Sequence, residues 1–406
     1  MRIALLTNEY PPNVYGGAGV HVEYLVRELA RLDDGAHDVD VYCFGEQREE
    51  RGNLRVRGVP AGNDLPATDP RHGKFLETMV RDVRMAGLVS GADVVHCHTW
   101  YSHFAGCLAS RLDDAKLVVT THSLEPHRPW KADQLGTAYH ASSWIEKTAY
   151  GSADGVIAVS ESMKEDVMSL YQVAAARIRV IPNGIDPDEY RPVDRPEMLA
   201  KHSIDASNPF VLFVGRITRQ KGIIHLVNAI RHLDEGTRIV LCAGAPDTEE
   251  IAAEMERAVA EARAAGDHDV AWIPQMLPRE EIIALYAAAA VFVCPSVYEP
   301  FGIINLEAMA CETAVVGSAV GGIPSIVVDG ETGLLVPFEP RGPRDVEPRQ
   351  PEQFSRDLAS AINRLMRDET GRRTMGERGR RRVLDRYSWR AVAERTLAYY
   401  RDVLSL

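Results

Sequence analysis

The feature that most constrains the fold is an alternation of short apolar strands with helices, which starts again half-way along the chain. The first round opens with an apolar strand at 2–7, a glycine-bearing loop and a helix at 20–32 with apolar side chains at helical spacing. The second opens with a strand at 210–214, followed again by a short loop and a helix. Strands that alternate with helices form parallel sheets covered on both faces. The sequence therefore predicts an α/β protein with two doubly wound, Rossmann-like domains.

The expected domain boundaries follow from this restart and from a polar, proline-bearing stretch at 190–207. A chain of 406 residues is long for one domain. We interpret the polar stretch as the interdomain crossing. The N-terminal domain is expected over residues 1–190 and the C-terminal domain over 191–388, with a last helix at 389–406 that crosses back to the N-terminal domain.

Two polar segments of the second half are expected at the surface. Residues 340–351 are rich in proline and charge and are predicted to form a loop. The helical stretch 360–387 carries a group of arginines, which is predicted to be a solvated face, with a membrane or polyanion patch as the alternative. The group consists of Arg372, Arg373, Arg378, Arg380, Arg381 and Arg382.

Charge and cysteine content exclude several functional classes. The net charge of −12 argues against nucleic acid as a partner, whereas small anions can still bind to local cations and helix ends. The six cysteines show no C-x-x-C spacing, which predicts reduced core thiols in a cytoplasmic protein rather than a zinc or redox site. No apolar run has the length of a transmembrane helix, and the run at the N-terminus is too short for a signal peptide, so no stable membrane association is expected.

The stretch 294–311 places two glutamates where a strand gives way to a helix. Glu299 falls on the loop at the carboxyl end of the strand, and Glu307 about a turn and a half into the helix. Ligands bind at this edge of an open α/β sheet, because free backbone N–H groups and the positive helix end point there. The carboxylates can bind sugar hydroxyls, and the helix start can bind an anion. A sugar nucleotide offers both groups, so the pattern indicates a sugar-nucleotide site. The alternative is that both residues are ordinary first-turn helix acids.

The first half of the chain offers its own candidates at strand ends. Gly16, Gly17 and Gly19 lack the G-x-G-x-x-G spacing of a nicotinamide site, and they allow either close approach to a ligand or a tight turn. His98 and His122 follow two apolar strands, where functional groups collect, although structural histidines are the alternative. Nearby aromatic residues fit either a core or sugar stacking: Trp100, Tyr101, Trp130, Tyr139 and Trp144.

Four short motifs occur together: Gly16-Gly17-Ala18-Gly19, Gly215-Arg216, Gln220-Lys221-Gly222, and Glu299 with Glu307 eight residues later. This combination resembles the retaining nucleotide-sugar glycosyltransferases of the GT-B fold, in the large family of the GT4 type that contains bacterial glycogen synthases. The resemblance covers essentially the whole chain. It implies two Rossmann-like domains facing across a cleft.

Three longer segments, at 8–22, 121–131 and 295–309, resemble the actinobacterial-type glycogen synthases, a subfamily also described as α-maltose-1-phosphate synthases. The resemblance implies transfer of glucose from ADP-glucose to glucose 1-phosphate, with retention, giving α-maltose 1-phosphate for glycogen synthesis. Elongation of an α-1,4-glucan is the related activity. No cofactor and no metal are implied, since no Asp-x-Asp stands at a strand end.

The resemblance also implies roles for individual residues. Arg216 and Lys221 would hold the donor diphosphate and the charge that develops as ADP leaves, a task that suits a guanidinium fork and a point cation. Glu299 would lie beside the transferred glucose, and His122 beneath its anomeric carbon. The family's favoured mechanism is same-face displacement, in which the leaving phosphate helps to take the acceptor proton.

The resemblance implies further donor contacts in the first turns of two helices and just before them. The amides of Phe301, Gly302 and Ile303 would reach the sugar and diphosphate, and Glu307 would bind the ribose. Gly17 would place its backbone against the donor phosphate.

The sequence departs from other bacterial glycogen synthases on the acceptor side. Their lysine near the first Gly-Gly pair is replaced here by Tyr15 or a neighbour, and their aspartate after the histidine-bearing strand by Thr99. A phosphorylated acceptor needs its own cations. We hypothesise that Arg128 and Lys131 supply them, the alternative being a solvated loop.

Two other functions compete with this interpretation. One is a related transferase that uses UDP-glucose or UDP-N-acetylglucosamine with an inositol phosphate or lipid acceptor. The other is an inert sugar-nucleotide sensor, which need not keep the leaving-group cations together with both glutamates. The sequence leaves the nucleobase preference and homo-oligomer formation open.

Overall fold

The computed structural model describes residues 1–14, 16–62, 65–128, 131–266, 268–342 and 345–406. Two compact units make up the chain. The first comprises residues 1–184 and 389–406, and the second residues 185–388. The chain therefore passes from one unit to the other after Gly184, rather than after residue 190, and returns after Ser388.

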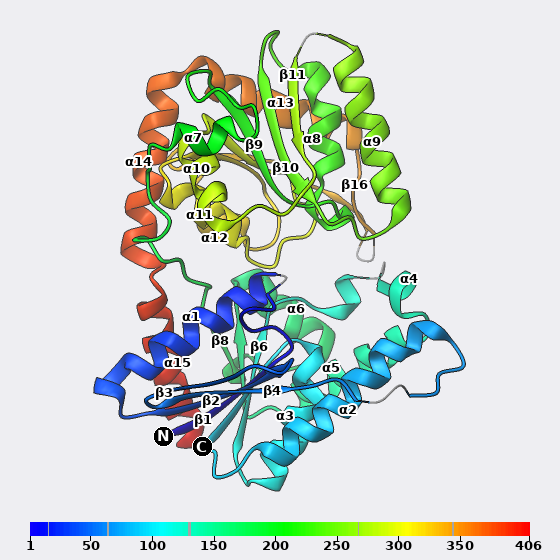
Figure 1. Cartoon of the computed structure of the whole chain (residues 1–406), viewed down its shortest axis with the longest axis vertical. Coiled ribbons are helices and arrows are strands. Elements are labelled where there is room, and N and C mark those ends of the chain that lie inside the picture. Colours follow the sequence, from blue (N-terminus) through cyan, green and yellow to red (C-terminus); the bar gives the residue numbers. More distant parts are fainter. Residues whose placement is uncertain (15, 63–64, 129–130, 267, 343–344) are drawn as a thin grey trace. The chain divides into compact units, whose positions relative to one another are not determined.

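The first unit is built on an eight-stranded sheet in the order β3-β4-β2-β1-β5-β6-β7-β8 (Figure 1). All neighbours are parallel except the pair of β3 and β4. The inner strands are almost wholly buried because both faces of a doubly wound sheet are covered by helices. The strands are β1 (Arg2–Thr7), β2 (Asp38–Phe44), β3 (Arg48–Arg51), β4 (Leu54–Val59), β5 (Val94–His98), β6 (Lys116–Thr121), β7 (Gly155–Ala158) and β8 (Ile178–Val180).

Helices of the first unit pack in two groups, α1 with the C-terminal α15, and α2 with α3, which also contacts α5. The last helix thus belongs to the first unit, and its buried side chains lie against α1 and the sheet. The helices are α1 (Gly17–Arg31), α2 (Gly73–Leu88), α3 (Trp100–Leu112), α4 (Lys131–Leu135), α5 (Ala138–Ser152), α6 (Glu161–Tyr171) and α15 (Trp389–Leu404), with 3-10 turns η1 (Leu32–Gly35), η2 (Pro70–His72), η3 (Glu125–His127) and η4 (Ala175–Arg177).

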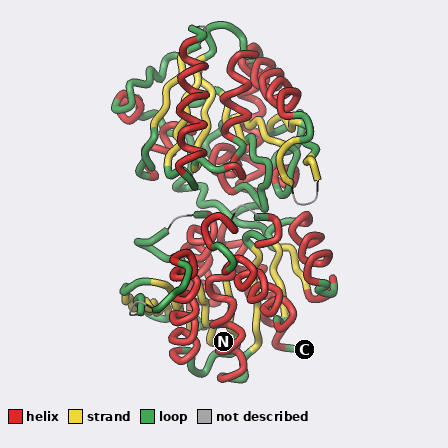
Figure 2. Tube along the Cα trace, turned by 90° about the vertical axis from the view of Figure 1, so that its right-hand side faces the viewer, coloured by secondary structure: helices red, strands yellow, loops and turns green. Residues whose placement is uncertain are grey.

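The second unit repeats the design with a six-stranded sheet, parallel throughout, in the order β11-β10-β9-β12-β13-β14. Figure 2 shows the strands of each unit lying between helices. The strands are β9 (Phe210–Arg216), β10 (Arg238–Gly244), β11 (Asp269–Ile273), β12 (Val291–Cys294), β13 (Ala314–Ser318) and β14 (Gly333–Val336). The helices are α7 (Pro196–Ala200), α8 (Ile223–Ala229), α9 (Glu249–Ala264), α10 (Arg279–Ala288), α11 (Ile303–Ala310), α12 (Ile323–Ile326), α13 (Pro351–Arg367) and α14 (Glu369–Arg386), with 3-10 turns η5 (Arg219–Lys221) and η6 (Ile230–His232). The prediction of two doubly wound α/β domains is confirmed.

The loop predicted for residues 340–351 was wrong in part. Strands β15 (Pro340–Gly342) and β16 (Asp345–Pro348) form an antiparallel pair there, and α13 already begins at Pro351. Proline is tolerated at the first residue of a strand and at a helix start, where its missing N–H is not needed. Proline content therefore misled the prediction.

The prediction that these arginines form a solvated face was also wrong in part, because three of them donate hydrogen bonds to backbone carbonyls at helix ends. Arg372 donates to Leu365 and Met366 at the end of α13. Arg380 donates to the carbonyl of Ala310, the last residue of α11, and Arg382 to that of Ile326, the last residue of α12. The last carbonyls of a helix lack intrahelical partners and attract cations. These side chains tie α14 to its neighbours.

None of the described helices has the length and apolar character needed to cross a bilayer.

The docking of α15 gives a first testable prediction. The hydroxyl of Tyr400 lies 2.5 Å from Nδ1 of His96, and both side chains are fully buried. Tyr400→Phe leaves that nitrogen without its partner, so the free energy of unfolding should fall by about 1–3 kcal/mol in urea denaturation. Leu406→Ala, at a residue 85% exposed, is the control. Equal stability of Tyr400→Phe and the wild type would contradict this account of how α15 is held.

Candidate active site

In the second unit Lys221 and Glu299 form a buried ion pair. Lys221 ends η5, just after β9, and Glu299 lies on the loop between β12 and α11. The Lys221 Nζ is 2.7 Å from Oε2 of Glu299, which also accepts a hydrogen bond of 3.2 Å from the Ser296 hydroxyl. Burial disfavours the Lys221 charge, but the Glu299 carboxylate outweighs it and raises the pKa of Lys221. The ammonium group therefore stays charged at neutral pH.

Contacts between backbone segments hold this pair in place. A Cβ at Gly222 would lie 2.0 Å from the carbonyl oxygen of Pro295, so the two loops touch where only glycine fits. Gly222 also has a φ of +60°, in the left-handed region. The Val297 N–H donates to the Gln220 carbonyl at 3.0 Å, next to that contact. The sequence Gln220-Lys221-Gly222 is thus fixed to the loop that carries Glu299.

The start of α11 lies in the same loop. Gly302 precedes the helix with a φ of +99°, Ile303 is its first residue, and Phe301 is buried. The Asn305 side chain donates to the Gly302 carbonyl at 3.0 Å and holds the turn. The first amides of a helix have no intrahelical acceptor and favour an anion. The backbone amides of Phe301, Gly302 and Ile303, which the resemblance assigns to the donor, therefore follow closely after Glu299 in the chain.

Arg216 and Glu307 lie on two further elements of this unit. Arg216 ends β9, and its NH1 is 3.1 Å from Oδ1 of Asp247 on the loop after β10. The Arg216 side chain is 42% exposed, which leaves the guanidinium accessible to a ligand. Glu307, on α11, accepts a hydrogen bond of 3.0 Å from the Tyr286 hydroxyl, and burial raises the pKa of Glu307. The structure brings Lys221 and Glu299 into contact, whereas Arg216 and Glu307 each have another side-chain partner.

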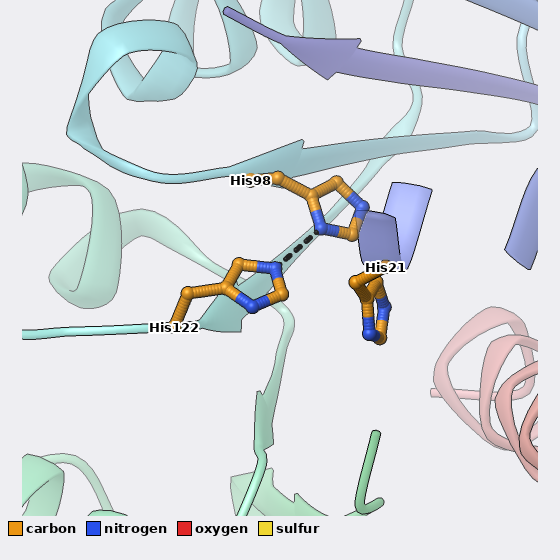
Figure 3. A group of neighbouring side chains, drawn as sticks. All are labelled: His21, His98 and His122. Carbon is orange, nitrogen blue, oxygen red and sulfur yellow. Dashed lines mark hydrogen bonds between the residues drawn. The ribbon is translucent and has the colours of Figure 1, made fainter. Parts of the chain in front are cut away.

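In the first unit His122 lies in a cluster of histidines (Figure 3). His98 and His122 come from the ends of β5 and β6, and His21 from α1. The Nδ1 of His98 is 2.9 Å from Nε2 of His122, and the Nδ1 of His21 is 2.7 Å from Oδ1 of Asn183. Burial lowers the pKa of His21 to about 4 and the pKa values of His98 and His122 well below the ordinary value. All three rings are therefore neutral at physiological pH.

One nitrogen of each histidine in this cluster lies within 4.8 Å of the others, so the set has the composition of a metal site. The hydrogen bond between His98 and His122 requires that one of the facing nitrogens carry a proton. A metal would have to displace that proton and open the 2.9 Å separation. The arrangement as it stands is a hydrogen-bonded pair that orients His122.

The three glycines lie at the start of α1, where Gly16 precedes the helix and Gly17 and Gly19 are part of it. Gly19 packs closely, since a Cβ there would lie 2.8 Å from the Glu9 carboxylate, whereas Gly16 and Gly17 are exposed. Gly17 is the first residue of α1, and His21 follows it one turn later on the same helix. The start of α1 and the histidine cluster are therefore held by one rigid element. Tyr15 lies outside the described residues.

Thr99, which the sequence analysis singled out on the acceptor side, follows directly after β5. It has a φ of +68°, which is uncommon for a β-branched residue, and its hydroxyl donates to Oδ1 of Asn8 at 2.9 Å. Of the nearby aromatic residues, Trp100 is buried, Trp144 is 62% exposed, and Trp130 lies outside the described residues. A core role for Trp144 is therefore wrong.

Arg128 and Lys131 both face Glu125, a residue that the sequence analysis did not single out. The Glu125 Oε1 lies 3.7 Å from Nζ of Lys131 and 3.9 Å from NH1 of Arg128. Glu125 is 1% exposed and Lys131 7%. Among the described residues, the buried Nε of Arg128 has no hydrogen-bond partner. The alternative of a solvated loop is wrong, because these cations are largely buried.

Two sequence-family models match the chain. Glycosyltransferase Family 4 matches residues 15–189, and Glycosyl transferases group 1 matches residues 194–382. The chain is 47% identical to an alpha-maltose-1-phosphate synthase of Mycolicibacterium smegmatis over 99% of its own length and 100% of that protein. It is 46% identical to the protein of the same name from Mycobacterium tuberculosis, over 99% and 100% of the two chains. The chain belongs to glycosyltransferase family 4.

A solved structure agrees with this family assignment. Sucrose-phosphate synthase from Thermosynechococcus elongatus has a TM-score of 0.77 and 28% identity, covering 100% of this chain and 99% of that one. The glycosyltransferase is a nucleotide-sugar-dependent hexosyltransferase with the GT-B fold, as the resemblance implied.

The structure adds residues of this glycosyltransferase that sequence reasoning missed. The Nζ atoms of Lys74 and Lys131 lie 5.9 Å and 5.4 Å from the centre of the Tyr101 ring, so three cations gather near this tyrosine when Arg128 is included. Tyr101 was noted only as a core or stacking candidate. Lys74 lies on α2 and, in the sequence, is remote from every motif named above. No pattern in the sequence distinguishes it from other helix lysines.

Two glycines offer a matched test of the loop contact in the glycosyltransferase. Gly222 and Gly236 both have positive φ, but no described atom lies within 4 Å of a Cβ at Gly236. Alanine at either position should cost about 1 kcal/mol of backbone strain. Only Gly222→Ala must also displace the loop at Pro295. This variant should therefore be less stable than Gly236→Ala, and its kcat/KM for the nucleotide sugar should fall about tenfold or more. Equal melting temperatures and rates for the two variants would contradict this contact.

Proposed function

We propose that this glycosyltransferase is an α-maltose-1-phosphate synthase. It transfers glucose from ADP-glucose to glucose 1-phosphate with retention and forms the α-1,4-linked product, and it also elongates α-glucans directly. The observation that carries the proposal is full-length identity of 46–47% to two proteins of that name. The six cysteines, all free and buried, support a cytoplasmic location as part of the proposal.

Most contacts to the donor diphosphate are assigned to residues of the second unit. Arg216 and Lys221 neutralise the charge that grows on the phosphate as ADP leaves, and the amides of Phe301, Gly302 and Ile303 add dipoles of the same sign. The raised pKa of Lys221 supports this role, because a charged ammonium is required. Glu299 accepts hydrogen bonds from the glucose hydroxyls and Glu307 from the ribose. The Gly17 backbone, at the start of α1, is assigned to the donor phosphate.

His122 is assigned to the reacting carbon. Positive charge develops at an anomeric carbon in the transition state, and a protonated imidazole there would oppose it. Burial keeps His122 neutral, and its hydrogen bond to His98 orients the ring. The leaving phosphate oxygen accepts the proton of the acceptor hydroxyl. The proposal assigns no covalent intermediate to any side chain.

The acceptor phosphate is assigned to Arg128 and Lys131 in the first unit. Among the described residues the buried Arg128 Nε lacks a partner, and Lys131 contacts Glu125 at 3.7 Å, beyond hydrogen-bond length. A phosphate ester supplies acceptor oxygens for both. A buried donor left unpaired costs about 1–3 kcal/mol, so a ligand that supplies acceptor oxygens to these cations is favoured.

Product analysis by ³¹P NMR tests the proposal. The protein is incubated with ADP-glucose and either glucose 1-phosphate or glycogen. A new sugar-phosphate signal together with ADP release is expected with glucose 1-phosphate. ADP release with glycogen alone would contradict the proposal in favour of a glucan synthase, and no ADP release with either acceptor would indicate another donor.

Removal of one acceptor cation gives a second prediction. Lys131→Ala should raise the KM for glucose 1-phosphate by about 10- to 100-fold. This change corresponds to the loss of the binding free energy of one charge-assisted hydrogen bond. Hydrolysis of ADP-glucose without acceptor should stay unchanged. Lys147→Ala, an exposed lysine on α5, is the control of equal charge change. Unchanged acceptor kinetics in Lys131→Ala would reject the assignment.

Metal removal gives a third prediction. Arg216 and Lys221 supply the electrostatic stabilisation that a divalent cation gives in metal-dependent transferases. Dialysis against EDTA should therefore leave the initial rate within about twofold of the untreated enzyme. A larger loss that Mg²⁺ or Mn²⁺ restores would contradict the assignment.

A further inference from the structure

Glu125, the first residue of the 3-10 turn η3, makes several hydrogen bonds to one helix. Its backbone N–H donates to Oε2 of Glu146 at 2.9 Å, and its carbonyl accepts a hydrogen bond of 2.6 Å from the Tyr139 hydroxyl. Its Oε2 accepts a hydrogen bond of 3.1 Å from Ser142. These three partners all lie on α5. Glu125 is therefore held against a helix through its backbone and through one carboxylate oxygen.

The second carboxylate oxygen faces the two cations assigned to the acceptor. At 3.7 and 3.9 Å the contacts from Glu125 Oε1 to Lys131 and Arg128 are too long to be hydrogen bonds. Such contacts attract electrostatically but do not occupy the N–H donors. NH1 of Arg128 donates to the Ser123 hydroxyl at 3.3 Å, whereas its buried Nε has no partner among the described residues. Both cations are thus held in a buried site without having their donors occupied by the carboxylate.

Glu146 supports Glu125 from the other side. It is 1% exposed and accepts hydrogen bonds from the Glu125 N–H and from the Tyr171 hydroxyl. Burial, together with the neighbouring Glu125 charge, raises the pKa of Glu146 to about 8. Glu146 is therefore mostly protonated at neutral pH, and Oε1 of Glu125 is the carboxylate oxygen that faces the cations.

We propose that Glu125 is a positioning residue of the acceptor site, which aligns Arg128 and Lys131 for a phosphate ester while leaving their donors open. This inference rests on the proposed function. The ligand class is the phosphate group of a sugar phosphate. The phosphate brings negative charge to a buried cluster that otherwise contains two cations and one anion.

The two buried glutamates allow a matched comparison. Glu125→Gln removes the charge that faces the cations and keeps the shape, so the KM for glucose 1-phosphate should rise about tenfold or more while kcat and the KM for ADP-glucose stay within about threefold. Glu146→Gln resembles the protonated form of Glu146 and should change the acceptor KM by less than about twofold. Glu125→Asp should restore part of the acceptor affinity. Melting temperatures identify any variant that is misfolded.

A pH profile separates this role from a merely structural one. Burial, with the Arg128 charge, lowers the pKa of Lys131 to about 8, Lys74 acts in the same direction, and Glu125 and Glu146 oppose them. Lys131 also faces the Tyr101 ring. Loss of the Glu125 charge lowers the pKa of Lys131 further, so Lys131 deprotonates at lower pH. The acceptor KM should therefore begin to rise at lower pH in Glu125→Gln, whereas in the wild type it rises only as pH passes about 8.

The outcomes distinguish this inference from the proposed function. A wild-type enzyme that does not use glucose 1-phosphate would overturn both. A wild-type enzyme that uses it would overturn the role of Glu125 alone if the Glu125→Gln variant kept the wild-type acceptor KM and pH profile. Equal losses in Glu125→Gln and Glu146→Gln would also overturn it, since they would show only that the buried cluster is needed for folding.

Discussion

Burial of cations beside fixed carboxylates is the constraint on which the candidate site depends. Taking an ammonium or guanidinium group out of water is unfavourable unless a partner compensates. Lys221 is compensated by Glu299, and Lys131 with Arg128 by Glu125. Each carboxylate is held by the fold, Glu299 by the loop contact at Gly222 and by Ser296, and Glu125 by α5. The fold therefore prepares positive charge for phosphate groups in both units.

The two cation sites differ in how tightly the carboxylate holds the cation. Lys221 and Glu299 make a hydrogen bond of 2.7 Å, so Lys221 keeps a well-defined position and a raised pKa. The contacts of Glu125 are about 1 Å longer, and the pKa of Lys131 is lowered instead. In the proposed reaction this difference has a use. The donor cation has to stay charged while the leaving group departs, whereas the acceptor cations have to keep N–H donors available for a phosphate.

Much of the fold could be predicted from the sequence because parallel strands buried on both faces are continuous apolar runs. The placement of Glu299 on a loop and of Glu307 on a helix followed from the same pattern. Contacts between distant segments could not be predicted that way. Glu125 and Glu146 look like ordinary acids in the sequence, and Lys74 like any helix lysine. Arg380 and Arg382 donate hydrogen bonds to backbone carbonyls at helix ends, and the spacing of side chains in the sequence does not indicate such partners.

We infer that a buried, incompletely paired cation group in the first unit recognises a phosphate ester. Equilibrium dialysis of radiolabelled glucose 1-phosphate against the protein saturated with ADP is the test, with radiolabelled glucose as the comparison. The account predicts saturable binding of one glucose 1-phosphate per chain, displaced by inorganic phosphate, and no measurable binding of glucose at the same concentration. Equal binding of the two sugars, or glucose 1-phosphate binding that inorganic phosphate does not displace, would contradict it.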